Sequence, residues 1–167
     1  ILHESDFIVK KVCGTIVTSP NVAGKAHIDV RSRNYLKGAY EELNVPLSLM
    51  PPVKEVGEVV GHVSEDASHE TGLPEGIPVV NGVTDGTAGD IATGVLKTGQ
   101  LNVTIGTTLV VHAVVDKLVP DEMGRIYYKT FLGSTYIAGG ATDAGTLPLD
   151  AVSGLLRINL QELDVLA

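Results

Sequence analysis

Residues 72–86 read GLPEGIPVVNGVTDG, and this stretch determines how the rest of the chain is interpreted. Its centre, residues 76–82, is a short apolar run that is entered through a proline and left through a glycine, which is typical of a buried strand. Thr84–Thr87 predict a turn, and residues 86–95 predict a helix because their apolar side chains recur on one face. Ligands bind where strands of an α/β sheet end. The stretch therefore predicts an α/β protein with a site at Asp85.

The segments on either side of this stretch continue the mixture of helices and strands. Helices are expected at residues 6–13, 34–43 and 65–70, and strands at residues 59–63, 101–105, 109–115, 126–131 and 135–138. Gly106, Thr107 and Thr108 predict a tight turn between two of these strands. Gly139 and Gly140 predict a loop that leads into a final helix. Alternating elements of this kind favour the α/β class.

The composition excludes several classes of protein. The chain has 167 residues, of which 44% are hydrophobic, and it carries a net charge of -8 without a basic run. Nucleic-acid binding needs clustered Lys and Arg, so we expect no nucleic-acid partner. No stretch approaches the roughly 20 apolar residues of a membrane span, so we expect no membrane partner. The single cysteine, Cys13, excludes an internal disulfide and favours a reduced, cytoplasmic setting.

Asp85 is the residue with the clearest chemical potential. A carboxylate at the end of a strand, with glycines on either side, can approach a substrate hydroxyl and accept its proton. The alternative is a helix N-cap, which is the commoner role of an aspartate at this position. The position alone leaves both readings open.

Two glycine-bearing segments could bind phosphate. The Gly106–Thr108 turn offers N–H and O–H donors, and residues 139–145 lie between a strand and a helix, where helix N–H groups can meet an anion. A plain hairpin turn and a glycine-rich helix entry are the alternatives. The histidines lack metal-ligand spacing and read as surface or packing residues: His3, His27, His62, His69 and His112. No metal-ligating residue is therefore predicted.

Taken in order, these segments resemble the FGGY family of carbohydrate kinases, most closely the xylulokinase and ribulokinase kind of pentulose kinase. Residues 72–86 are similar to the family's Gly-Leu-Pro-x-Gly-x-Pro-Val-x-x-Gly-x-x-Asp segment. Residues 105–108, Ile-Gly-Thr-Thr, and then Gly139–Gly140 follow at the family's spacing. The resemblance covers nearly the whole chain.

The resemblance implies an actin-like ATPase (ribonuclease H-like) fold, with parts of two lobes. Residues 1–97 would form the end of a sugar-binding lobe, and residues 98–167 the start of a nucleotide-binding lobe. Asp85 would be the general base, and Asp85 and Gly86 would contact the sugar. The residues implied to contact ATP are Gly106, Thr107, Thr108, Gly140 and Thr142. Magnesium would accompany the ATP, as phosphoryl transfer generally requires.

The family's first phosphate loop and its adenine-binding segment are expected before Ile1 and after Ala167. We therefore expect a central fragment that does not catalyse transfer alone. Residues 143–146 repeat the Asp-x-Gly-Thr pattern of that phosphate loop, but Pro148 and the preceding glycines fit it poorly.

The resemblance leaves the substrate and some alternatives open. The substrate class implied is a small sugar or polyol, with a pentulose such as xylulose or ribulose ahead of glycerol or gluconate. A non-catalytic actin-like module is the main alternative, and a homodimer is compatible with the sequence. A hydrolase is disfavoured because no Ser-His-Asp arrangement is readable.

Overall fold

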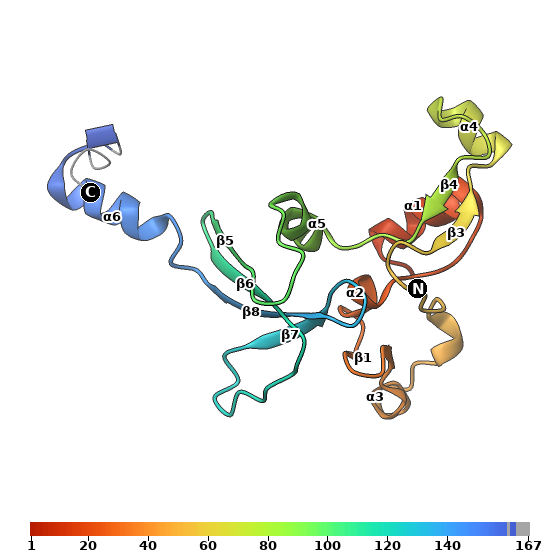
Figure 1. The fold of residues 1–167 in the computed structure, drawn as a ribbon, viewed down its shortest axis with the longest axis horizontal. Helices are drawn as coiled ribbons and strands as arrows, with labels where there is room; N and C mark the ends of the chain where they lie inside the picture. The colour runs from red at the N-terminus through yellow and green to blue at the C-terminus, as the bar shows by residue number, and fades with distance from the viewer. Residues whose placement is uncertain (160, 163–167) are drawn as a thin grey trace.

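A computed structural model describes residues 1–159 and 161–162 of the chain, which form an open, elongated arrangement (Figure 1). Its elements, in chain order, are α1 (Glu4–Cys13), α2 (Pro20–Ala23), β1 (Ile28–Asp29), β2 (Asn34–Tyr35), α3 (Lys37–Glu42), the 3₁₀ helix η1 (Leu47–Leu49), β3 (Val59–His62), α4 (Glu65–Thr71), β4 (Pro78–Val80), α5 (Asp85–Ala92), β5 (Leu101–Ile105), β6 (Leu109–Val115), β7 (Tyr127–Thr130), β8 (Tyr136–Thr142) and α6 (Leu147–Leu156).

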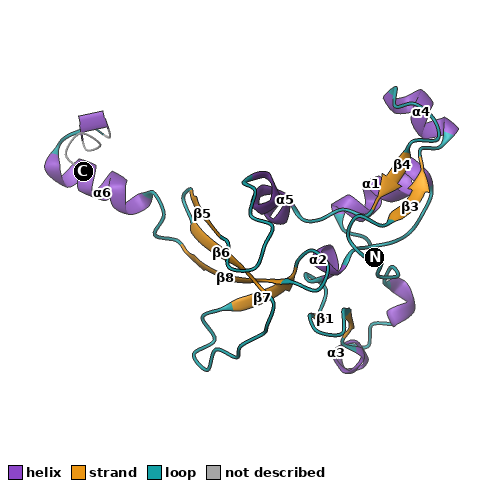
Figure 2. Cartoon of the chain, in the orientation of Figure 1, coloured by secondary structure: helices purple, strands orange, loops and turns teal. Residues whose placement is uncertain are grey.

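The largest unit is an antiparallel sheet of four strands in the order β5-β6-β8-β7 (Figure 2). Val114 and Ile137 of this sheet form a small buried cluster with Val95 and Phe131, against which Ile91 of α5 packs. Burial of such side chains is the main favourable term in folding. The cluster fixes α5, and with it Asp85, against the sheet.

The N-terminal part is built on a second, two-stranded sheet of β3 and β4, with α1 packed against it. A Cβ atom on Gly61 would lie 2.7 Å from Cys13 Sγ, so α1 approaches the backbone of β3 directly. Gly14 and Gly72, each with φ of 76°, end α1 and α4 in the left-handed conformation that favours glycine.

The expected mixture of helices and strands is confirmed, and so are most of the individual elements. Three expectations were wrong. Residues 76–82 do not form a buried strand, because β4 covers only Pro78–Val80 and its edge leaves Ile77 and Val80 exposed. The helix expected from Asn34 begins only at Lys37, because Asn34 and Tyr35 pair with β1. Gly139 and Gly140 are not in a loop: they lie within β8, where both pair with β6 and Gly139 also pairs with β7. Cross-strand hydrogen bonds overrode the local preference of glycine for turns.

Much apolar surface remains exposed. The accessible surface is 10624 Å², whereas a compact monomer of this mass exposes about 7,900 Å². The excess includes α6, which has no buried residue, and the outer strand β5, with Leu149, Leu155, Val103 and Ile105 all exposed. Among the described residues, no helix combines the length and apolar character needed to cross a membrane.

Candidate active site around Asp85

Asp85 is the first residue of α5 and lies at the point where the chain leaves β4. Thr84, and not Asp85, occupies the N-cap position, and the Asp85 side chain is exposed. Its Oδ1 accepts a hydrogen bond of 2.8 Å from the Gly86 N–H. The N-cap alternative for Asp85 is therefore wrong, and its carboxylate is free to face solvent or a ligand.

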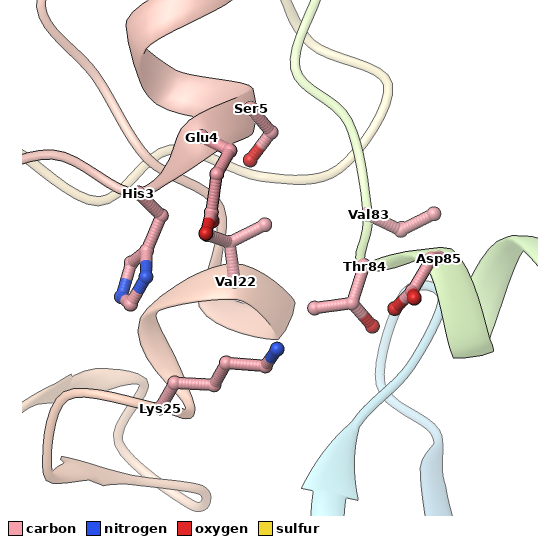
Figure 3. A pocket seen from close by; sticks show the side chains of 8 residues that line it. All are labelled: His3, Glu4, Ser5, Val22, Lys25, Val83, Thr84 and Asp85. Atoms are coloured by element: carbon pink, nitrogen blue, oxygen red, sulfur yellow. The ribbon is translucent and has the colours of Figure 1, made fainter.

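Two cavities meet at Asp85. One has a volume of about 320 Å³ and lies between the start of α1, the end of α2 and the entry to α5. Figure 3 shows Lys25 extending toward Thr84 and Asp85 from one side of this cavity, with His3 and Glu4 on the α1 side. The other has a volume of about 420 Å³ and is lined by residues that include Asn21, Asp85, Tyr127 and Lys129. Either is large enough to hold a small polar ligand beside the carboxylate.

Asn21 holds the entry to α5 in place. Its side chain is 3% exposed, and its Oδ1 accepts hydrogen bonds from the Thr84 N–H (2.9 Å) and hydroxyl (3.1 Å). Its Nδ2 donates to Thr87 Oγ1 at 3.1 Å and to the Thr130 carbonyl of β7 at 2.8 Å. One amide thus joins α2, the first turn of α5 and the sheet. Asn21 therefore positions Asp85 indirectly, through its hydrogen bonds to the preceding residue, Thr84.

We expect Asn21→Leu to lower the free energy of unfolding of the full-length protein by about 1–3 kcal/mol, because the partly buried Thr84 N–H and the buried Thr130 carbonyl lose this partner. Equilibrium unfolding in urea measures this change. Asn34→Leu is the matched control, since Asn34 is exposed and, among the described residues, its side-chain amide bonds only the nearby Ser32 carbonyl. Equal losses in the two variants would contradict the role of Asn21.

A buried polar cluster lies further along α5. Asp90 is 1% exposed and its carboxylate contacts His112 Nδ1 of β6 at 2.8 and 3.0 Å. It also accepts a hydrogen bond of 2.9 Å from Asn102 Nδ2, and Lys129 Nζ lies 3.9 Å away. His112 Nε2 lies 2.7 Å from the Tyr127 hydroxyl. The cluster links α5 to three strands of the sheet.

Burial shapes the acid–base behaviour of this cluster. Desolvation lowers the pKa of Lys129, an effect that the negative charges of Asp90 and Asp85 oppose. Burial likewise raises the pKa of the Tyr127 hydroxyl, with a further contribution from Asp90. Tyr127 is therefore a neutral phenol at physiological pH. Within the described residues, no group of three or more His, Cys, Asp or Glu side chains is arranged to hold a metal ion.

The Gly106–Thr108 turn joins β5 to β6, as the sequence predicts. Two backbone hydrogen bonds from the segment after β8, here called the clasp, hold this turn. The Gly145 N–H donates to the Thr107 carbonyl at 3.1 Å, and the Thr146 N–H donates to the Gly106 carbonyl at 2.8 Å. A Cβ atom on Gly145 would overlap the Gly106 carbonyl oxygen, so only glycine fits there. Thr107 and Thr108 are exposed, and in the described part of the chain their N–H groups have no protein partner. Such N–H groups suit an anion.

The structure brings the candidate residues together in two places. Asp85 and Gly86 share the 420 Å³ cavity. The second place is the Gly106–Thr108 turn, which lies at the end of the sheet nearer α6. The start of α5 lies on the other side, where the chain arrives from β4 (Figure 1). Gly140 and Thr142 lie on β8 opposite Val111 and Leu109 of β6. Thr142 also lines a hollow with Asp143, Ala144 and Leu147 beside the turn.

Sequence reasoning missed Asn21, Asp90, His112, Tyr127 and Lys129. For His112 and Asp90, the sequence does carry a signal. His112 interrupts the apolar strand LVVHAVV, and Asp90 falls on the helix face that also carries the buried Thr87. A buried polar residue requires a hydrogen-bonding partner. The partner itself is not readable from the sequence, because it lies 22 residues away.

Comparison with known proteins shows which family this chain matches. A sequence model described as "FGGY family of carbohydrate kinases, N-terminal domain" matches residues 1–92. The autoinducer-2 kinase of Yersinia enterocolitica is 35% identical over 104 residues, covering 62% of this chain and 20% of that protein. The chain thus spans about a fifth of the length of the curated relatives it matches.

Solved structures show the same fold. The xylulose kinase of Rhodospirillum rubrum matches with a TM-score of 0.83 and 26% identity, over 91% of this chain and 31% of that one. The gluconate kinase of Lactobacillus acidophilus matches with a TM-score of 0.87 and 16% identity, over 98% of this chain and 34% of that one. Since the family model covers more than half of its residues, the chain belongs to the FGGY family of carbohydrate kinases.

Proposed function

We propose that the protein containing this chain transfers a phosphoryl group from ATP to a hydroxyl of a small sugar or polyol. Asp85 would serve as the general base. The observation that carries this proposal is the placement of an exposed carboxylate at the first turn of α5, where two cavities meet. Membership of the FGGY family supports the reaction class.

Asp85 would act on the acceptor substrate. A carboxylate oxygen within hydrogen-bond reach of the sugar hydroxyl accepts its proton as that oxygen attacks the phosphorus. Gly86 has no side chain, so the sugar can come close to the backbone at the start of the helix. Asn21 would keep this end of the helix fixed during the reaction, because it binds the Thr84 N–H.

The Gly106–Thr108 turn would hold the nucleotide. Its exposed hydroxyls and N–H groups are donors of the kind that phosphate oxygens accept, and the clasp from Gly145 and Thr146 fixes their direction. Gly140 and Thr142 lie on the adjoining strand and would line the same side. Magnesium carried with ATP would neutralise phosphate charge.

A pentulose is the acceptor we favour. The structural relatives include xylulose kinases, of which the Rhodospirillum rubrum enzyme is 26% identical to this chain. Gluconate and glycerol kinases are also among them. In this proposal residues 1–97 belong to the sugar-binding lobe and residues 98–167 to the nucleotide-binding lobe. The cytoplasmic location and the homodimer stay predictions.

The test is ADP release by the full-length protein. The acceptors are D-xylulose, D-ribulose, L-ribulose, L-xylulose, glycerol, gluconate and, because of the autoinducer-2 kinase relatives, autoinducer-2. Release that depends on one acceptor would support the proposal and identify the substrate. ATP binding without release with any acceptor would favour the non-catalytic module.

A further inference from the structure

Four residues stand in one row across the sheet. Asn102 of β5 pairs with His112 of β6, His112 pairs with Gly139 of β8, and Gly139 pairs with Tyr127 of β7. A Cβ atom on Gly139 would lie 2.6 Å from Tyr127 Cζ, so the tyrosine ring passes directly over this glycine. The glycine leaves the space through which Tyr127 reaches across β8 to His112.

Asp90 fixes the direction of the hydrogen bonds in this row. Its carboxylate can only accept, so the proton shared with His112 belongs to Nδ1. Asp90 also accepts a hydrogen bond from Asn102, and Lys129 Nζ lies 3.9 Å from Asp90 Oδ2. A neutral imidazole with a proton on Nδ1 can only accept at Nε2. With His112 in this form, the Tyr127 hydroxyl donates its proton to Nε2, which lies 2.7 Å away.

With its proton committed to His112, the Tyr127 oxygen can only accept another hydrogen bond. Tyr127 is 43% exposed and lines the 420 Å³ cavity together with Asp85. We propose that Tyr127 binds the acceptor substrate by accepting a hydrogen bond from a hydroxyl that is not phosphorylated, and that Asp90 and His112 are the positioning residues that fix its polarity. This inference rests on the proposed function, because it assigns a specificity residue to the same site.

The consequence is a preference for polyhydroxylated substrates. A cavity that offers an acceptor at Tyr127 and another at Asp85 suits a ligand with two hydroxyl donors. A substrate without the second hydroxyl leaves the tyrosine oxygen without its partner, which costs affinity. Lys129 stands two residues along the same strand and lines the same cavity. Its Nζ lies 3.9 Å from Asp90 Oδ2.

The first test reads the proton positions directly and does not depend on activity. In the full-length protein labelled with ¹⁵N-histidine, we expect His112 to be neutral, with its proton on Nδ1. Asp90→Asn should reverse this tautomer, because the asparagine NH₂ can donate to Nδ1. A doubly protonated His112, or a proton on Nε2 in the unmodified protein, would overturn the proposal.

The second test uses the acceptor sugar with the strongest ADP release and its monodeoxy analogues. We expect the unmodified protein to discriminate against one analogue about tenfold in kcat/KM, and Tyr127→Phe to abolish this discrimination by raising KM for the sugar while kcat stays nearly unchanged. Tyr35→Phe is the control, since within the described part of the chain its hydroxyl bonds only the Pro51 carbonyl, away from the site. Unaltered discrimination in Tyr127→Phe would overturn the proposal even though transfer itself is confirmed.

A third variant disturbs Tyr127 without changing it. Gly139→Ala places a methyl group where the ring lies, so the ring must move away from His112. We expect this variant to lose the same discrimination as Tyr127→Phe. If Gly139→Ala retained full discrimination, the placement of the Tyr127 ring would not matter for specificity and the proposal would fail.

Discussion

Asp85→Asn in the full-length protein is expected to lower kcat for phosphoryl transfer about 100- to 10,000-fold, because loss of a positioned general base has an effect of this size. The sugar dissociation constant should change little, since the amide keeps the shape of the carboxylate and one of its acceptor oxygens. Steady-state kinetics and calorimetric titration with the sugar measure the two quantities separately.

Asp66→Asn is the matched control for this variant. Asp66 is an exposed aspartate in the first turn of α4, so it shares the favourable interaction of an acid with a helix N-terminus but lies on another helix. We expect its kinetics to match those of the unmodified protein. Retention of full activity by Asp85→Asn would remove Asp85 from the role of base.

Gly145→Ala is expected to weaken nucleotide binding about 10- to 100-fold, the loss expected when donors to a charged phosphate are displaced. The added methyl group would lie 2.7 Å from the Thr107 carbonyl oxygen and would overlap that of Gly106, which are backbone atoms and cannot rotate away. The turn must therefore shift, and its Thr107 and Thr108 donors shift with it. Titration of the full-length protein with ADP measures the change.

Two further glycine variants separate folding from ligand contact. Gly154→Ala places its methyl group in open space on α6, so nucleotide affinity should stay unchanged. In Gly106→Ala, the added methyl group would lie 3.7 Å from the Thr108 carbonyl, which is an ordinary contact, so the fold should accept it. A loss of ADP affinity in this variant would then show that the nucleotide binds close to Gly106. Normal affinity in Gly145→Ala would show that the turn does not bind the nucleotide.

The elements that the sequence predicts correctly are those whose pattern is local. Residues 101–115 alternate a strand, a Gly-Thr-Thr turn and a strand, and the hairpin forms where expected because no distant partner is needed to define it. The glycine pair in β8 shows the limit. Gly139 and Gly140 have no side chains that favour a strand, and only pairing with β6 and β7 makes them one.

The candidate site divides in the same way. Asp85 is recognisable because strand, turn and helix signals surround it within a few residues. The partners that determine its surroundings come from distant parts of the chain: Asn21 lies 63 residues before Thr84, and Asp90 meets His112 across 22 residues. Hydrogen bonds between such residues depend on tertiary packing and leave no periodic pattern in the sequence.

The buried hydrogen bonds of Asn21 and Asp90 also have a mechanical consequence. They join α2 and α5 to the sheet across the proposed lobe boundary at residue 97, so these elements should move together while other parts of the two lobes move apart. A rotation of the sheet would then move the Asp85 carboxylate relative to α1. The 320 Å³ cavity would change its shape because α1 residues line it. The 420 Å³ cavity would keep its shape, because its lining residues do not come from α1.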